Sequence, residues 1–184
     1  MKSVYIILTQ SGTRFSKFLK FVTKEKYNHA SICLDNSFDE FYSFARKIPT
    51  RPLPAGFVTE NAFKHVFGKF EEVPCLVLEK QLTEEQYDEL SNLINYFIKN
   101  KKQISYAFIT LAFANTNYSV VSDTKYFCSQ FVAKVLNDIA IETPKNPEHM
   151  HPMDFTQLNG VKVVFEGDLK KFCNTPKNES TVFA

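Results

Sequence analysis

Residues 27–46, YNHASICLDNSFDEFYSFAR, predict a β-hairpin that sets the fold of the chain around it. Two runs rich in β-branched and aromatic residues flank the turn-forming triplet DNS at 35–37, a pattern typical of two antiparallel strands joined by a loop. Successive side chains of a strand point to opposite faces. One face of the first strand is therefore expected to carry Tyr27, His29, Ser31 and Cys33.

The length of the loop decides which residue of the return strand lies opposite His29. If the loop is centred on the middle of the triplet, that residue is Ser43. A shift of one residue would bring Tyr42 or Phe44 there instead. Glu40 is acidic and close in sequence, but it pairs farther along the hairpin and is a weaker partner for the imidazole.

Short apolar runs elsewhere predict further strands, at 3–8, 72–80 and 161–167. The clearest helix follows the second of these, because TEEQ at 83–86 is a capping box. Its apolar face is expected to contain Tyr87, Leu90, Ile94, Phe97 and Ile98.

Three other segments have less regular patterns. Ser11 can cap a helix that continues to Lys24, residues 105–116 are apolar and fit either a helix or a strand, and residues 151–160 predict a turn and a short helix. Because strands and helices are mixed without strict alternation, we expect one α+β domain over residues 1–184, with a mostly antiparallel sheet packed against helices.

Composition excludes several classes of protein. A net charge of +2 with dispersed lysines gives little support for a nucleic-acid partner. The N-terminus lacks the apolar run and cleavage site of a signal peptide, and no segment has the roughly 20 apolar residues of a membrane span, so a cytoplasmic protein is predicted. The 19 phenylalanines indicate either an aromatic core or an apolar cleft for an acyl chain.

No cofactor or metal site is predicted. The four cysteines form no CxxC pair and are expected to be reduced thiols. His149 and His151 resemble a pair of zinc ligands, but no third ligand is near in sequence. His65 stands among apolar residues and is interpreted as structural.

Cys128 lies in KYFCSQFVAKVLN, residues 125–137, which predicts a helix through its apolar spacing. Its side chain would lie on the face that packs into the protein, as a core cysteine would. If Asp123 or Thr124 caps the helix, Cys128 also falls in the first turn, where unpaired N–H groups and the helix dipole favour a thiolate. Both interpretations remain open at this point. A nucleophilic thiol needs a base, and His29 on a rigid strand is the candidate.

Together, these segments resemble the circularly permuted papain-like hydrolases of the NlpC-type superfamily, in particular the YiiX-like branch. That branch carries an H-x-S-I strand, a Y-S-F return strand and a C-S-x-F-V helix, which match His29–Ile32, Tyr42–Phe44 and Cys128–Val132. The resemblance implies a permuted papain-like fold, Cys128 as nucleophile and His29 as base. Ser43 occupies the family's third position, where an acidic, amide or histidine side chain is commoner.

The resemblance also implies a reaction class. A thiol-dependent amidase or peptidase acting on a small amide or ester, lipid-linked substrates included, is expected. The alternatives are an acyltransferase of the lecithin retinol acyltransferase type and a catalytically silent binding module. The backbone N–H of Cys128 and the side chain of Gln10 are the expected donors to an oxyanion. The sequence leaves the natural substrate and the oligomeric state open.

Overall fold

A computed structural model describes residues 1–10, 26–46, 55–101 and 126–175 of the chain. Its strands are β1 (Lys2–Thr9), β2 (His29–Cys33), β3 (Phe41–Arg46), β4 (Ala55–Glu60), β5 (Pro74–Leu82) and β6 (Val161–Asp168). Its helices are α2 (Glu84–Lys99), α4 (Tyr126–Asp138) and α5 (Leu169–Asn174), with short 3-10 helices η1 (Phe67–Lys69), η2 (Pro147–His149) and η3 (Pro152–Gln157).

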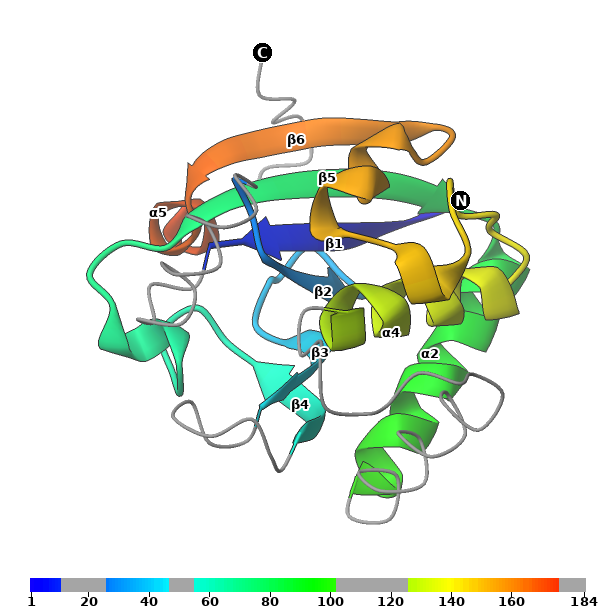
Figure 1. Ribbon diagram of the computed structural model, residues 1–184, viewed down its shortest axis with the longest axis horizontal. Helices are drawn as coiled ribbons and strands as arrows, with labels where there is room; N and C mark the ends of the chain where they lie inside the picture. Colours follow the sequence, from blue (N-terminus) through cyan, green and yellow to red (C-terminus); the bar gives the residue numbers. More distant parts are fainter. Residues whose placement is uncertain (11–25, 47–54, 102–125, 176–184) are drawn as a thin grey trace.

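The six strands form one antiparallel sheet in the order β4-β3-β2-β1-β5-β6. The helices α2 and α4 lie on one face of this sheet, with α4 across β2 and β3 (Figure 1). An antiparallel sheet with helices packed on it is an α+β architecture, which confirms the predicted class. Strands were predicted for five of the six positions, whereas no strand was predicted at β4.

The predicted hairpin is present, but its predicted register is wrong. Ile32 pairs with Tyr42, so the connection is centred on Ser37, one residue later than expected. The reason lies in the turn: the Asp35 carboxylate accepts hydrogen bonds from both the backbone N–H and the hydroxyl of Ser37, and Phe38 follows in the left-handed region with φ of 54°. Continuing this register places Ala45, rather than Ser43, opposite His29.

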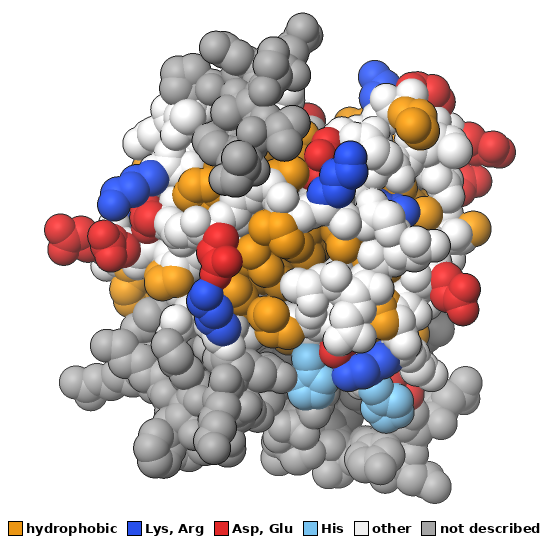
Figure 2. Space-filling view, turned by 90° about the horizontal axis from the view of Figure 1, so that it is seen from above, with side chains coloured by type: hydrophobic (Ala, Val, Ile, Leu, Met, Phe, Trp, Pro, Cys, Tyr) orange, Lys and Arg blue, Asp and Glu red, His pale blue; other side chains and the backbone are white. Residues whose placement is uncertain are grey.

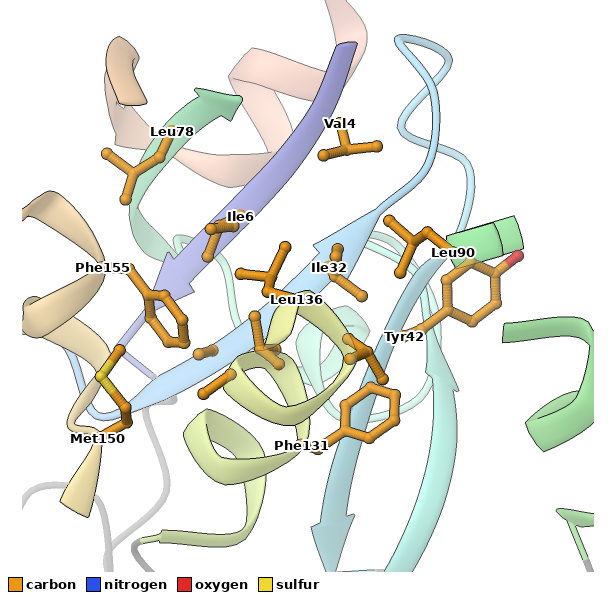
Figure 3. Close-up of a cluster of buried hydrophobic side chains, with 14 of the residues drawn as sticks. Val4, Ile6, Ile32, Tyr42, Leu78, Leu90, Phe131, Leu136, Met150 and Phe155 are labelled. Atoms are coloured by element: carbon orange, nitrogen blue, oxygen red, sulfur yellow. The ribbon is translucent and has the colours of Figure 1, made fainter. Parts of the chain in front are cut away.

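Each face of the sheet has its own hydrophobic cluster. The cluster beneath α4 joins alternate residues of the central strands, such as Ile6, Ile32 and Leu78, to Phe131 and Leu136 of the helix (Figure 3). The apolar residues whose spacing predicted this helix, which are Phe131, Val132, Val135 and Leu136 of α4 and Ile139 just after it, are all at most 1% exposed. Aromatic rings account for much of this packing, since Phe57, Phe97 and Phe131 lie 5.2–5.6 Å apart between ring centroids.

The opposite face is covered by α5 and by the segment around η1. Its cluster includes Ile7, Cys33, Phe41, Phe67 and Cys75, with Phe172 of α5 packed among them. The alternation predicted for β2 holds within the strand, because Ala30 and Ile32 face α4 while Cys33 faces this second cluster. Tyr27 precedes the strand and packs on the α4 side, so the alternation does not extend to it.

The capping box predicted for α2 is present. The Thr83 hydroxyl accepts from the Gln86 backbone N–H, and the Gln86 side chain accepts from the Thr83 N–H, each at 3.1 Å. Leu90, Ile94 and Phe97 of this helix are buried as predicted. Tyr87 is partly buried, whereas Ile98 is 39% exposed and lies outside the packed face.

β6 is an edge strand with an exposed apolar residue. The side of the molecule where β6 lies shows hydrophobic side chains at its centre and charged side chains around them (Figure 2). Val163 of β6 is 57% exposed. A bulge opposite Val77 and Leu78 interrupts the ladder between β5 and β6, and such irregularity discourages edge-to-edge pairing.

Some predictions fall outside the described residues: the helix beginning at Ser11, the apolar segment 105–116, and the capping residues Asp123 and Thr124. Within the described ranges, no helix combines the length and hydropathy needed to cross a bilayer.

Thr9 supplies a test of packing in the sheet. Its hydroxyl is fully buried and has no hydrogen-bond partner among the described atoms. A buried hydroxyl without a partner costs about 1–3 kcal/mol. Thr9→Val keeps the β-branched shape and removes that cost, so we expect the free energy of unfolding, measured by urea denaturation, to rise by about 1 kcal/mol. A decrease of similar size would show that the hydroxyl is solvated or bonded in solution.

Candidate active site

His29 begins β2 at the point where the strand emerges beside β1. Its backbone pairs with Thr9, and its side chain is 13% exposed. The ring of Phe67 from η1 lies against it, with 6.3 Å between the ring centroids. Strand pairing on one side and an aromatic neighbour on the other therefore fix the imidazole, while one edge remains accessible.

Glu60, the last residue of β4, is the hydrogen-bonding partner of this imidazole. Its two carboxylate oxygens lie 3.0 and 2.9 Å from Nε2 of His29. The Glu60 side chain is only 12% exposed, so this ion pair is largely removed from water. Because Nε2 is occupied by the carboxylate, Nδ1 is the ring nitrogen left for a second partner.

Ser31 completes the surroundings of the carboxylate. It is fully buried, and its hydroxyl donates to Oε2 of Glu60 at 2.6 Å. The hydroxyl oxygen of Ser31 also lies 3.3 Å from Nε2 of His29. His29 and Ser31 are two residues apart on one strand and thus share a face, as the sequence predicted.

Cys128 is the third residue of α4 and is 4% exposed. Its backbone N–H lies in the first turn of α4 as the described residues define it. Its sulfur is hydrogen-bonded to the His29 side chain and to the backbone N–H groups of Ala30 and Ser129. Ser129 in turn donates to the Met150 carbonyl and attaches this turn to the segment before η3. The thiol and the imidazole, 99 residues apart in sequence (128 − 29), are therefore neighbours.

The electrostatics of the pair favour the charged form of both groups. Burial by itself would lower the pKa of His29, but the charges of Glu60 and Cys128 outweigh it and hold the pKa well above its usual value. Burial would likewise raise the pKa of Cys128. The His29 charge and hydrogen bond, together with the two backbone N–H groups, overcome that effect and lower it.

The other buried thiols behave in the opposite way. Burial raises the pKa of Cys33 and of Cys75 to about 12, and among the described residues neither has a cationic partner that reverses the effect. Cys173 is partly exposed at the end of α5 and packs beside them. Cys128 is thus distinguished by its neighbours rather than by its burial.

The prediction of Ser43 as the partner of His29 does not agree with the geometry. Ser43 is fully buried, and its hydroxyl donates to the Ala30 carbonyl at 2.7 Å. The two-residue difference between the expected and observed partners of His29 follows from the turn at Ser37. Glu40 and Tyr42, the other candidates, bond to each other at 2.9 Å.

Glu60 was missed because β4 was not recognised. A sequence signal was present: FVTE at 57–60 begins with the strand formers Phe57, Val58 and Thr59 and ends on an acid followed by Asn61, a turn former. A strand after the hairpin joins the sheet beside β3, and from there the Glu60 side chain reaches His29 and Ser31 on β2. Recognition of this third strand would have made Glu60 a candidate.

A pocket of about 250 Å³ adjoins the site, with Glu60 in its lining. Phe57, Val58 and Phe67 give it apolar walls, and Lys64 and Lys101 contribute positive charge to the lining. Glu60 therefore belongs both to this pocket and to the surroundings of His29.

His149 and His151 flank Met150 between η2 and η3. In the part of the chain that the structure describes, no group of three or more His, Cys, Asp or Glu side chains is placed to hold a metal ion. His65 is exposed and has a left-handed backbone, with φ of 54°.

A thiol, an imidazole and a carboxylate in this order can do nucleophilic chemistry. The imidazole can take the thiol proton, and the carboxylate can orient the ring and stabilise its cation. Comparisons with protein-family models and with curated proteins found no match for this chain.

Proposed function

We propose that the protein is a thiol-dependent hydrolase of the amidase or peptidase type, in which Cys128, His29 and Glu60 act together on a small amide or ester. The observation that carries this proposal is the imidazole held between a buried carboxylate and a thiol of lowered pKa. Papain-like enzymes likewise pair a cysteine with a histidine that a third polar group orients, and the resemblance of the His29 and Cys128 segments supports a permuted papain-like fold.

The cycle begins from the thiolate–imidazolium pair. The sulfur of Cys128 attacks the acyl carbon, and negative charge develops on the carbonyl oxygen. The backbone N–H of Cys128, in the first turn of α4, can donate to that oxygen. The imidazolium then gives its proton to the departing amine or alcohol, which leaves a thioester and a neutral His29.

Water completes the hydrolysis. Neutral His29 takes a proton from the water as it attacks the thioester, and the acid product leaves as the thiolate–imidazolium pair is restored. An acceptor other than water at this step would make the protein an acyltransferase, through the same residues. Gln10 follows β1 near this site, and because its backbone N–H donates to Pro74 at 2.9 Å, only its side chain could serve the oxyanion.

Selective alkylation tests the nucleophile. With iodoacetamide at pH 6–7, we expect Cys128 to be modified faster than Cys33, Cys75 and Cys173, because its pKa is lowered while burial raises those of Cys33 and Cys75. Peptide mapping by mass spectrometry measures each rate. His29→Ala should slow modification of Cys128 at least tenfold, roughly one unit of thiol pKa. Labelling of Cys128 no faster than of Cys173 would support a binding module instead.

Cys128→Ala separates the reactive role from a packing role. Only one sulfur leaves a site at the edge of the core, and alanine suits a helix, so we expect thermal unfolding to change little. Acyl transfer and alkylation at this position should be abolished. A loss of several kcal/mol, of the size seen on truncating large core side chains, would mark the thiol as packing.

Glu60→Gln tests the carboxylate. Glutamine keeps the shape but loses the charge that raises the pKa of His29, so that pKa should fall by about 1 unit or more. With less imidazolium to stabilise it, the thiolate should form only at higher pH, and the rise of alkylation rate with pH should move upward. Glu40→Gln is the matched control, because Glu40 bonds to Tyr42 rather than to His29. Equal profiles for the two variants would exclude Glu60 from the mechanism.

A further inference from the structure

A buried hydroxyl supports the carboxylate of the proposed catalytic group. Ser31 is fully buried on the strand that carries His29, and its hydroxyl hydrogen goes to Oε2 of Glu60 at 2.6 Å. That distance lies in the range typical of a charge-assisted bond from a hydroxyl to a carboxylate oxygen. We propose that Ser31 is a positioning residue, which holds both oxygens of Glu60 against Nε2 of His29 and thereby keeps the imidazole fixed toward Cys128.

Without this bond, the Glu60 carboxylate would be less fixed in position. Glu60 is at the end of an edge strand, and it lines a pocket together with Lys64 and Lys101. Either lysine would attract a carboxylate that rotated away from the imidazole. The Ser31 hydroxyl lies on the His29 side, 3.3 Å from Nε2, so its bond opposes that rotation.

Few charged or titratable groups among the described residues lie near His29, so a change in its pKa can be assigned to one of them. Charged or titratable neighbours in the described residues are Glu60 from β4 and Cys128 from α4, while η1 contributes the uncharged ring of Phe67. Beyond Glu60, the pocket adds His65 to the two lysines. Loss of the Ser31 bond therefore acts on the imidazole mainly through Glu60.

This role rests on the proposed function, yet it can be tested without turnover. In a Cys128→Ala background, Glu60 is the remaining anion at the ring, and NMR titration of the His29 Cε1 proton reports its pKa directly. We expect Ser31→Ala to lower that pKa by about 0.5–1 unit, the equivalent of one hydrogen bond. An unchanged or raised pKa would overturn the proposal, whatever the fate of the proposed reaction.

Ser43→Ala is the matched control. Ser43 is equally buried and donates a hydrogen bond of 2.7 Å from the neighbouring strand, but to the Ala30 carbonyl rather than to Glu60. Both variants should lose similar stability in urea denaturation, while only Ser31→Ala should shift the His29 titration. Equal shifts in the two variants would mean that the effect is general loosening of the strands, and the positioning role would be wrong.

A double-mutant cycle gives the last criterion. If Ser31 acts through Glu60, then Ser31→Ala should cause no further shift once Glu60→Gln is present. Additive shifts would show that the hydroxyl acts on the ring independently.

With the thiol intact, Ser31→Ala should slow alkylation of Cys128 at pH 6 by about three- to tenfold, the kinetic counterpart of the same 0.5–1 unit. If wild-type Cys128 is unreactive while the NMR shift is found, the positioning role stands and the proposed hydrolase does not.

Discussion

The site depends on burying three ionisable groups that cannot be buried singly. A carboxylate or a thiolate taken out of water without a partner is strongly disfavoured, and an imidazolium equally so. Glu60 is 12% exposed, His29 13% and Cys128 4%, so each is largely desolvated. Their charges alternate, with the His29 cation between the Glu60 carboxylate and the Cys128 thiolate, and this attraction offsets the free-energy cost of burying them. The same alternation produces the raised pKa of His29 and the lowered pKa of Cys128.

The sheet brings the three groups together through its meander. Strands β1 to β4 follow one another across the sheet in the order in which they occur in the chain. Strands β2 and β4 therefore lie on either side of β3. The Ser43 hydroxyl on β3 satisfies the Ala30 carbonyl beside His29. α4 then packs across β2 and β3, and its first turn carries Cys128 to the start of β2 (Figure 1). Ser43 therefore supports the backbone of the site without being a partner of the imidazole.

The parts of this arrangement with a local cause could be predicted from the sequence. The hairpin, the capping box of α2 and the apolar face of α4 each follow from residues close in the chain. The prediction that His29 and Cys128 lie close together rested on a resemblance to a known family. The predicted register was wrong because two hydrogen bonds from Ser37 to Asp35 and a left-handed Phe38 moved the centre of the turn one residue later, which turn statistics do not specify. Glu60 was missed because its role depends on which strands are neighbours, and that is a tertiary property.

A carboxylate behind the imidazole has consequences that an amide would not have. With Cys128 and His29 as an ion pair, a neutral third group leaves the set without net charge, whereas Glu60 leaves it at −1. The additional charge keeps the proton on His29 to higher pH, which protects the thiolate and favours the step in which sulfur attacks. It also makes that proton harder to give up to a leaving group, since a stronger base is a weaker acid once protonated. For the proposed reaction, the site would therefore gain a persistent nucleophile at the expense of proton donation, and among the proposed amide and ester substrates, those whose leaving groups need little protonation would suit it best.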